Sequence, residues 1–411
     1  MGGFKTITKC RSCASGEIRP FFSLGAQPPA NALPLGSSKK EKAYPLSLDR
    51  CARCGLVQLH ETVDKRFLFS HYLWVTGTSG TARAFAEQFS RACLARAGDM
   101  TASYVLEIAS NDGTFLIPFQ KKGYRVLGVD PAKNLVALAR RLKVPTTCAF
   151  FGKREAERIR ARRGAAGLVI ARNVLPHVAN TRDFVAGLAA AVHEEGVVVV
   201  EAHYAKIMLE ELHYDSIYHE HLCYFTFKTL ERLLNEFGLF VFDATRSPIS
   251  GGSIVVYASK TKRPERVSVR RLRATETKDG TNSLSSWRDF AKRAREHRRA
   301  FVSLLRREVL AKKRIVGYGA SARSSTLLNF CKINRRVIEA IADQNPLKHG
   351  RWTVGSQIPI KDPAEVFAMH PDVVCILAWN FKDEIMRNAR RIYGYRGPFI
   401  VPLPFKPAKI L

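Results

Sequence analysis

The sequence predicts an α/β protein with two mostly parallel sheets and a small N-terminal unit of a different kind. In the first α/β region, four apolar runs alternate with helical patterns: SYVLEIA, YRVLGVD, AGLVIAR and GVVVVEAH. A second series begins at residue 314 and comprises RIVGYGA, VIEAIAD, DVVCILAW and GPFIVPLP. Strands that are separated by helices imply right-handed crossovers, and therefore parallel pairing within each sheet.

The 411 residues are too many for one core, and we expect three domains. Residues 1–70 are rich in turns, with QPPANALPLGSS between two cysteine pairs. Residues 71–262 hold the first α/β unit, in which SIVVYAS at 253–259 is a late strand of the same sheet. Residues 263–411 include a charged amphipathic helix at 283–312 and then the second, Rossmann-like unit.

The charge balance points to anionic partners, because 66 Lys and Arg face 36 Asp and Glu for a net charge of +30. A solvated helix face and a basic connector are one explanation, and attraction of a phosphorylated small substrate is another. Nucleic acid is a less favoured partner, since no reader motif accompanies the charge. No apolar run reaches the roughly 18 residues of a membrane span, and the N-terminus lacks a signal-peptide core. We therefore expect a cytoplasmic protein without a membrane partner.

Two CxxC pairs, Cys10/Cys13 and Cys51/Cys54, give the most specific metal signal. Each pair offers two thiolates on a tight turn, and together they complete a tetrahedral Zn²⁺ site. Four protein ligands close the coordination shell, so the zinc is expected to be structural; free thiols are the alternative. The other five cysteines are scattered and are expected to be small buried hydrophobes.

Three loops lie where ligands bind in open α/β sheets. VLEIASNDGTFL is a strand that ends at Glu107, a small-residue turn at 110–113 and a helix, and Asp130 ends the next strand. Small residues let a cofactor approach the backbone, and the second carboxylate suits ribose hydroxyls. One glycine instead of three argues against a dinucleotide, and ARNVLPHV adds Asn173 and His177 at the same sheet edge. Singly each loop could be an ordinary turn, but their order is the layout of a class I S-adenosylmethionine (SAM)-dependent methyltransferase.

GYGASARSS, at 317–325, is a second strand–loop–helix turn. The helix N-terminus can accept an anion through backbone N–H groups, with Arg323 nearby. Asp343 ends the following strand. An ordinary turn is the alternative, but two such units in one chain suggest two separate nucleotide-bearing ligands.

YHEHLCYF, at 218–225, concentrates titratable side chains in an apolar setting. Read as a strand, it would turn His219 and His221 to the same side, as some metal sites require. Further ligands would then have to come from residues such as Glu201, His203 and Glu210. Proton transfer without a metal is favoured over this metal site, and a structural polar strand is the third possibility.

The ordered set of motifs resembles the sugar C-methyltransferase family over nearly the whole chain. The motifs that show this resemblance are the CxxC pair followed by QPPAN, then CARCGLVQL, ASNDGTFL, NVLPHV, YHEHLCYF, SGGSIVVY, and GYGASARSS with ADQNPLKHGR. The resemblance implies a zinc-binding domain, a central methyltransferase domain and a C-terminal Rossmann-like domain that helps hold a nucleotide sugar. The family methylates a carbon next to the keto group of a nucleotide-linked 4-keto-deoxysugar.

The resemblance also implies roles for individual residues, which fall into three groups. The methyl-donor pocket would contain Tyr72, Glu107, Asn111, Asp112, Gly113, Asp130, Asn173 and His177. The sugar would lie at Tyr218, His219, Glu220 and His221. The C-terminal domain would bind substrate through Gly317, Gly319, Arg323, Asp343 and Lys348. HYLWVTGTS, at 71–79, departs from the family because Trp74 and Val75 stand where more polar or phenolic side chains are usual.

The expected chemistry follows from the substrate, because a sugar C–H carbon becomes a nucleophile only as an enolate. We expect His221 to remove the α-proton, since the ordinary pKa of histidine lies near physiological pH. Tyr218 or His219 would donate a hydrogen bond to the enolate oxygen, and Glu220 would orient a histidine or bind a sugar hydroxyl. The alternatives are an O- or N-methyltransferase and a zinc-containing nucleic-acid-binding protein. The protein is expected to be a monomer or a homodimer.

Overall fold

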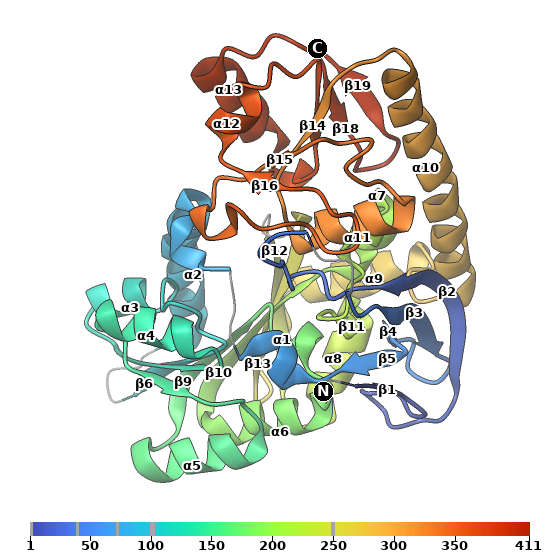
Figure 1. Cartoon of the computed structure of the whole chain (residues 1–411). Coiled ribbons are helices and arrows are strands. Elements are labelled where there is room, and N and C mark those ends of the chain that lie inside the picture. The colour runs from blue at the N-terminus through green and yellow to red at the C-terminus, as the bar shows by residue number, and fades with distance from the viewer. Residues whose placement is uncertain (1–2, 38–40, 71–73, 99–102, 248–250) are drawn as a thin grey trace.

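A computed structural model of the chain describes residues 3–37, 41–70, 74–98, 103–247 and 251–411. Its strands form a 2-stranded, a 4-stranded, a 6-stranded and a 7-stranded sheet. The N-terminal sheets, the 7-stranded sheet and the 6-stranded sheet lie in separate regions that meet near the middle of the molecule (Figure 1). Helices are labelled α, or η where they are short 3-10 helices.

The N-terminal sheets contain the cysteine pairs. The 2-stranded sheet pairs β1 (Phe4–Thr6) with β5 (Glu61–Val63). The 4-stranded sheet has the order β11 (Cys223–Tyr224), β4 (Val57–Leu59), β3 (Tyr44–Cys51) and β2 (Ile18–Gln27), all antiparallel. Its edge strand β11 therefore comes from YHEHLCYF, and its Cys223 pairs with Gln58 of β4, which lies 165 residues earlier in the chain.

The central sheet has the strand order β12-β13-β10-β9-β6-β7-β8. The strands are β6 (Tyr104–Ile108), β7 (Arg125–Asp130), β8 (Thr146–Cys148), β9 (Ala166–Arg172), β10 (Val192–His203), β12 (Phe240–Ser247) and β13 (Ser253–Ser259). Neighbours from β8 to β10 pair in parallel, whereas β13 runs antiparallel between β10 and β12. The prediction of a mostly parallel sheet that includes 253–259 is confirmed.

Helices cover this sheet on both faces, which explains why its strands are continuous apolar runs. The helices of this region and the N-terminal link are α1 (Lys65–Phe69), η1 (Thr76–Thr78), α2 (Gly80–Ala97), α3 (Ile117–Lys121), α4 (Lys133–Arg141), α5 (Lys153–Arg163), η2 (Leu175–His177), α6 (Thr181–Ala191), α7 (Ala205–Glu211), η3 (Tyr214–Ser216), α8 (Phe227–Asn235) and α9 (Val267–Lys278). The sequence between β10 and β12 thus consists of short helices, turns and the strand β11, and it contains the YHEH residues.

The C-terminal sheet has the order β16-β15-β14-β17-β18-β19. Its elements are β14 (Ile315–Tyr318), α11 (Ala322–Cys331), β15 (Ile341–Ala342), η5 (Pro346–Lys348), β16 (Ile360–Lys361), α12 (Pro363–Phe367), β17 (Val373–Ile376), η6 (Trp379–Phe381), α13 (Lys382–Tyr393), β18 (Phe399–Val401) and β19 (Ala408–Ile410). All pairs are parallel except β18 with β19. This is the expected second Rossmann-like unit, with one added antiparallel strand.

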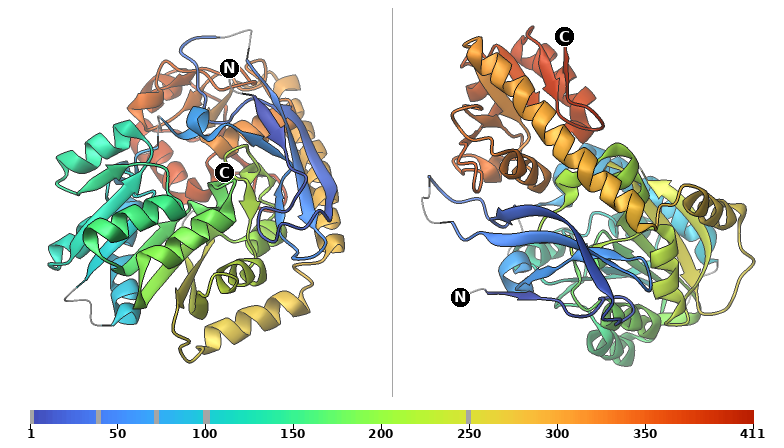
Figure 2. Two further views of the ribbon diagram at one scale, coloured as in Figure 1. Left: turned by 90° about the horizontal axis from the view of Figure 1, so that it is seen from below. Right: turned by 90° about the vertical axis from the view of Figure 1, so that its right-hand side faces the viewer.

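The predicted amphipathic helix is α10 (Leu284–Leu310), which runs beside the N-terminal sheet and reaches the C-terminal unit (Figure 2). Its buried side includes Trp287 and Phe290, which contact Phe21 and Phe22 of β2 at ring distances of 5.9 and 6.1 Å. Phe22 also meets Phe330 of α11 at 5.9 Å. None of the described helices combines the length and the apolar character that a membrane crossing needs.

Candidate active site

The loop after β6 gathers buried polar groups at the carboxyl edge of the central sheet. Glu107 is buried, its Oε2 has no hydrogen-bond partner among the described residues, and burial raises its pKa to about 8. Ser110 Oγ is likewise buried without a partner there. Unpartnered buried polar atoms are costly unless a ligand or water completes them, so this edge suits a polar ligand.

Asp130 ties this loop to the end of β7. Its Oδ2 accepts the Asn111 backbone N–H at 2.9 Å, and its Oδ1 accepts the Ala132 N–H at 2.8 Å. Each carboxylate oxygen keeps a second lone pair for a ribose hydroxyl. Burial raises the pKa of Asp130 to about 6 despite these two donors.

The segment before α2 lies directly on the same loop. Asn111 Oδ1 accepts the Thr76 N–H at 2.9 Å, and Asn111 Nδ2 donates to the Trp74 carbonyl at 3.1 Å. Asp112 Oδ2 accepts the Gly77 N–H at 2.9 Å. Trp74, Thr76 and Gly77 therefore lie against the loop that is expected to bind the methyl donor, whereas Tyr72 lies outside the described residues.

Gly113 is a glycine for a local reason. Its φ of +82° favours glycine, and a Cβ there would lie 2.9 Å from three carbons of Val144. Gly113 is thus required by its contact with the Val144 side chain. Asn173 also has positive φ, at 49°, and its N–H donates to the Glu201 carbonyl at 2.7 Å.

The YHEH residues form a turn, so the strand geometry on which the metal alternative depended is wrong. The His221 N–H closes the turn on the Tyr218 carbonyl at 2.8 Å. His219 Nε2 contacts the Pro45 carbonyl of β3 at 3.0 Å, whereas His221 turns to other partners. A chain reversal separates the two imidazoles that a strand would have placed on one side.

His221 has both ring nitrogens engaged. Nδ1 lies 2.8 Å from the Ser216 carbonyl and Nε2 lies 2.7 Å from the Tyr218 hydroxyl. A carbonyl only accepts, so Nδ1 carries the proton in the neutral ring and Nε2 keeps its lone pair. The Tyr218 hydroxyl therefore donates to Nε2.

The environment keeps His221 neutral. Burial, with His177 beside it, holds the pKa of His221 well below its ordinary range. The rings of His177 and His221 meet edge to face at 4.8 Å, and burial lowers the pKa of His177 to about 4. The structure thus brings His177 to the YHEH turn, although the sequence placed it in the donor pocket.

Glu220 points to the N-terminal region. Both of its carboxylate oxygens accept hydrogen bonds from Asn31 Nδ2, at 2.9 and 2.7 Å. Asn31 belongs to the QPPAN motif, so this motif and the YHEH turn are joined in space. Sequence reasoning missed Asn31 as a site residue, although its motif was among the carriers of the resemblance.

The residues predicted for the C-terminal unit also gather. Asp343 Oδ2 accepts the Ala320 N–H at 2.8 Å and lies 3.0 Å from Lys348 Nζ, which also donates to the Ala320 carbonyl. Gly319 has a φ of +96°, and a Cβ there would lie 2.3 Å from Ala378 Cβ. A Cβ at Gly317 would meet Leu377 and Ile341, so this glycine makes room for core side chains.

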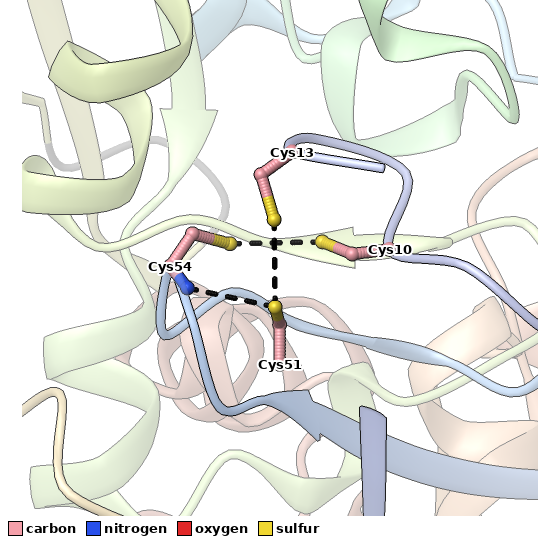
Figure 3. Close-up of side chains that lie close together, drawn as sticks. All are labelled: Cys10, Cys13, Cys51 and Cys54. Carbon is pink, nitrogen blue, oxygen red and sulfur yellow. Dashed lines mark hydrogen bonds between the residues drawn. The ribbon is translucent and has the colours of Figure 1, made fainter. Parts of the chain in front are cut away.

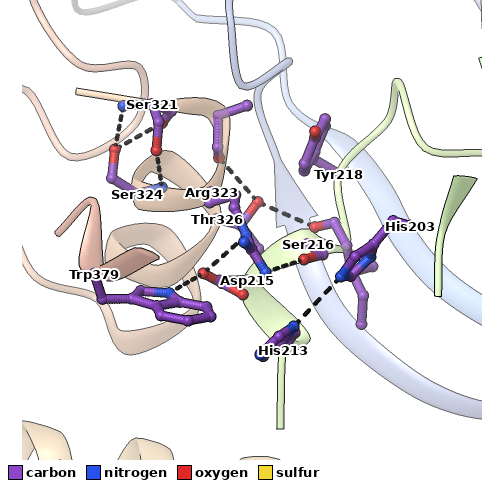
Figure 4. A network of polar contacts seen from close by, with 12 residues as sticks. His203, His213, Asp215, Ser216, Tyr218, Ser321, Arg323, Ser324, Thr326 and Trp379 are labelled. Atoms are coloured by element: carbon purple, nitrogen blue, oxygen red, sulfur yellow. Dashed lines mark hydrogen bonds and ion pairs between the residues drawn. The ribbon is translucent and has the colours of Figure 1, made fainter. Parts of the chain in front are cut away.

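Arg323 lies at the junction of the central and C-terminal units. Its Nη2 donates to Ser216 Oγ at 2.6 Å and its Nε lies 3.3 Å from Asp215 Oδ2 (Figure 4). Asp215 and Ser216 gave no signal in the sequence, because one Asp and one Ser in a loop have no diagnostic spacing.

The four N-terminal cysteines converge on one point (Figure 3). Cys10 and Cys54 sulfurs lie 3.6 Å apart, Cys13 and Cys51 sulfurs lie 3.5 Å apart, and all four lie within 4.8 Å of one another. Tetrahedral Zn²⁺ with bonds of about 2.3 Å needs sulfurs about 3.8 Å apart, so the cluster fits zinc. Among the described residues it is the only group of three or more potential ligands so close together. Within that part of the chain, Glu201, His203 and Glu210 therefore do not complete a metal site with the YHEH histidines.

Comparisons with known proteins agree with this geometry. Residues 10–69 match a family of zinc binding domains, residues 79–243 match a methyltransferase domain, and residues 248–404 match the C-methyltransferase C-terminal domain. The chain is 33% identical over 405 residues to the C-methyltransferase NovU of Streptomyces niveus, covering 97% of this chain and 96% of that protein.

Solved methyltransferase structures align with part of the chain. Magnesium protoporphyrin IX methyltransferase from Synechocystis PCC 6803 with bound SAM has 12% identity and a TM-score of 0.34, and covers 44% of this chain and 79% of its own. The CcbJ methyltransferase from Streptomyces caelestis has 14% identity and a TM-score of 0.34, with 44% and 90% coverage.

The fold and the matched domains define a SAM-dependent methyltransferase of class I with a zinc-binding N-terminal domain. Within that class, the chain belongs to the C-methyltransferase family.

Proposed function

We propose that this enzyme methylates the carbon next to the keto group of a nucleotide-linked 4-keto-deoxysugar. The contact of Tyr218 with His221 carries the proposal, because it places a phenol donor beside an imidazole lone pair. Methyl transfer to oxygen or nitrogen can use a base but needs no donor for an enolate oxygen, since those atoms already have a lone pair. A carbon acceptor needs both a base and a donor for the enolate oxygen.

In the proposed reaction, His221 Nε2 takes the α-proton as the C–H electron pair moves into the enolate. The Tyr218 O–H turns from Nε2 to the developing oxyanion, while the Ser216 carbonyl keeps Nδ1 protonated and the ring in place. His219 is engaged with the Pro45 carbonyl, so Tyr218 is the better candidate donor. The imidazolium formed at His221 then loses its proton to solvent after transfer.

The donor pocket would be built by Glu107, Asn111, Asp112, Asp130 and Asn173 at the sheet edge. When bound there, SAM supplies an electrophilic methyl group. The nucleotide part of the substrate would bind near the loop of Gly319 and Arg323, with Asp343 and Lys348 bracing it. We also propose the domain limits 1–70, 71–262 and 263–411.

The test is to incubate the protein with SAM and a panel of nucleotide-linked 4-keto sugars, and to identify the product by mass and carbon NMR. We expect a new C–CH₃ group next to the keto carbon. A methyl group on oxygen or nitrogen would contradict carbon transfer. Transfer to no sugar of the panel would sink the substrate assignment while leaving the donor pocket intact.

Exchange of the α-proton in D₂O without SAM tests the base separately. His221→Asn should slow exchange by about 10²–10⁴-fold, because the neutral base is lost. His193→Asn, at an exposed histidine of β10, should leave exchange unchanged. Because the pKa of His221 lies below 6.5, wild-type exchange should stay constant from about pH 7 to 8 and fall only in acid. Near-normal exchange by His221→Asn would make the base assignment wrong.

A further inference from the structure

The segment that precedes the YHEH turn is held by the C-terminal unit. The η3 helix (Tyr214–Ser216) contributes Asp215, whose Oδ2 accepts the Trp379 Nε1–H at 2.7 Å. The backbone carbonyl of Ile217, the residue after η3, accepts a hydrogen bond from the Thr326 hydroxyl of α11 at 3.0 Å. Trp379 and Thr326 both come from elements of the C-terminal unit (Figure 4).

Arg323 is the centre of this contact. It lies in the first turn of α11, immediately after the Gly319–Ser321 loop, and reaches both Asp215 and Ser216. Its guanidinium also lies over the Trp379 ring, at 4.7 Å from the centroid. The Arg323 side chain is 14% exposed and that of Asp215 is 1% exposed. Because Asp215 is buried and the guanidinium has these added contacts, the pair is held in a defined arrangement, as a positioning group requires.

Ser216 connects this contact with the base. Its side-chain oxygen accepts the Arg323 Nη2–H at 2.6 Å, while its backbone carbonyl accepts His221 Nδ1–H at 2.8 Å. By holding the Ser216 side chain, the C-terminal unit therefore also positions the Ser216 carbonyl, which fixes the tautomer of His221. Ser216 is thus the single residue that connects Arg323 with His221.

We propose that Arg323, with Asp215 and Ser216, is a positioning group that orients His221 from the C-terminal domain. Arg323 acts through Ser216 and does not touch the reacting carbon. A ligand bound at the loop before α11 would meet the same helix turn, so occupation of that loop and alignment of the base are linked. This inference rests on the proposed function, which makes His221 the base.

Ser216→Ala is the sharpest test, because it removes the hydroxyl and keeps the carbonyl that His221 uses. We expect kcat to fall by up to about 10²-fold, the cost of a small misplacement of a catalytic group. The KM for the keto sugar that the wild type turns over fastest should stay unchanged, and α-proton exchange should fall by the same factor as kcat. Arg323→Lys should act in the same direction, since a single ammonium cannot reproduce the two contacts.

Ser216→Ala and Arg323→Lys disturb the same contact, so kcat of the double variant should be little lower than that of the more impaired single variant. Arg335→Gln, at an exposed arginine just after α11, is the matched control and should behave as wild type. A raised KM with unchanged kcat in Arg323→Lys would show that Arg323 serves only in substrate binding, and would overturn the positioning role. Unchanged kcat in Ser216→Ala would overturn it as well.

A readout without substrate separates this inference from the proposed function. ¹⁵N NMR of the histidine side chains should show His221 protonated at Nδ1 in the wild type and a mixture of tautomers in Ser216→Ala and Arg323→Lys. If the wild type exchanges no α-proton while both variants show the mixture of tautomers, the proposed function alone would be rejected. An unaltered His221 tautomer in both variants would reject the positioning role alone.

Discussion

Asp130 carries a carboxylate whose charge changes within an accessible pH range. Burial raises its pKa to about 6, so the group is ionised at pH 7.5 and mostly neutral at pH 5. Because the folded pKa is raised, protonation on acidification removes the charge before an ordinary Asp would lose it. A neutral carboxyl is the poorer acceptor for ribose hydroxyls.

We therefore predict that the affinity for SAM falls by up to about tenfold between pH 7.5 and pH 5, measured by calorimetry. Asp130→Asn should bind weakly at both pH values and lose this pH dependence. The exposed Asp289→Asn on α10 should retain the wild-type profile. Equal affinities of the wild type at both pH values would show that the Asp130 charge does not contribute.

At the scale of residues, fixed spacing predicted the cysteine cluster, because the four sulfurs converge as the two CxxC pairs indicate. Among the YHEH residues, Tyr218 and His221 contact each other, whereas His219 turns to Pro45. Partners from distant segments were not predictable, because Asn31 meets Glu220 across 189 residues and Arg323 meets Ser216 across 107. Such pairs are defined by tertiary packing and leave no periodicity in the chain.

At the scale of elements, strand alternation predicted both parallel sheets, and the 283–312 pattern predicted α10. For the YHEHLCYF segment, the alternative of a continuous strand was wrong. An apolar run with aromatic residues favours a strand, but only Cys223 and Tyr224 form one, and they pair with Val57 and Gln58 of the N-terminal sheet. Pairing between elements of different domains overrode the local pattern.

The zinc cluster and the YHEH turn are therefore mechanically linked. Cys51 ends β3, the same strand supplies the Pro45 carbonyl to His219, and β4 pairs with β11 directly after the turn. Zinc would hold the end of this sheet, whose buried side chains, such as Leu46 and Leu48, belong to a core shared with the rest of the chain. Loss of zinc should loosen the turn while leaving the donor loops of the central sheet in place.

We predict that Cys51→Ser lowers bound zinc and reduces turnover by about 10²-fold, because the base is displaced. Affinity for SAM should stay close to that of the wild type. Metal analysis measures the bound zinc, calorimetry measures the affinity for SAM, and an activity assay on the same preparation measures turnover. Cys148→Ser, at an exposed cysteine outside the cluster, should keep its zinc. Parallel loss of SAM binding and turnover would instead indicate general unfolding.

At the scale of the whole molecule, the net charge of +30 exceeds what the proposed chemistry requires. Part of it lies on the exposed side of α10, for example at Arg299 and Arg306, where the opposite side is buried against β2 and α11. Such a field attracts an anionic diphosphate and acts on the encounter, not on the chemical step. Because screening grows with ionic strength, the contribution is separable by salt.

The KM for a nucleotide-linked keto sugar should accordingly rise with salt while kcat stays constant. Changing Arg299 and Arg306 to Glu lowers the net charge from +30 to +26, since each change removes two charges. This variant should have a higher KM than the wild type at low salt, and the difference should shrink at about 1 M salt, where the Debye length is about 3 Å. The KM for SAM, a cationic sulfonium, should not rise with salt.

A KM for the sugar that is independent of salt would show that the excess charge has another role. Salt-sensitive binding of random-sequence DNA that is weaker in the Glu variant would then show that this face of α10 can bind nucleic acid.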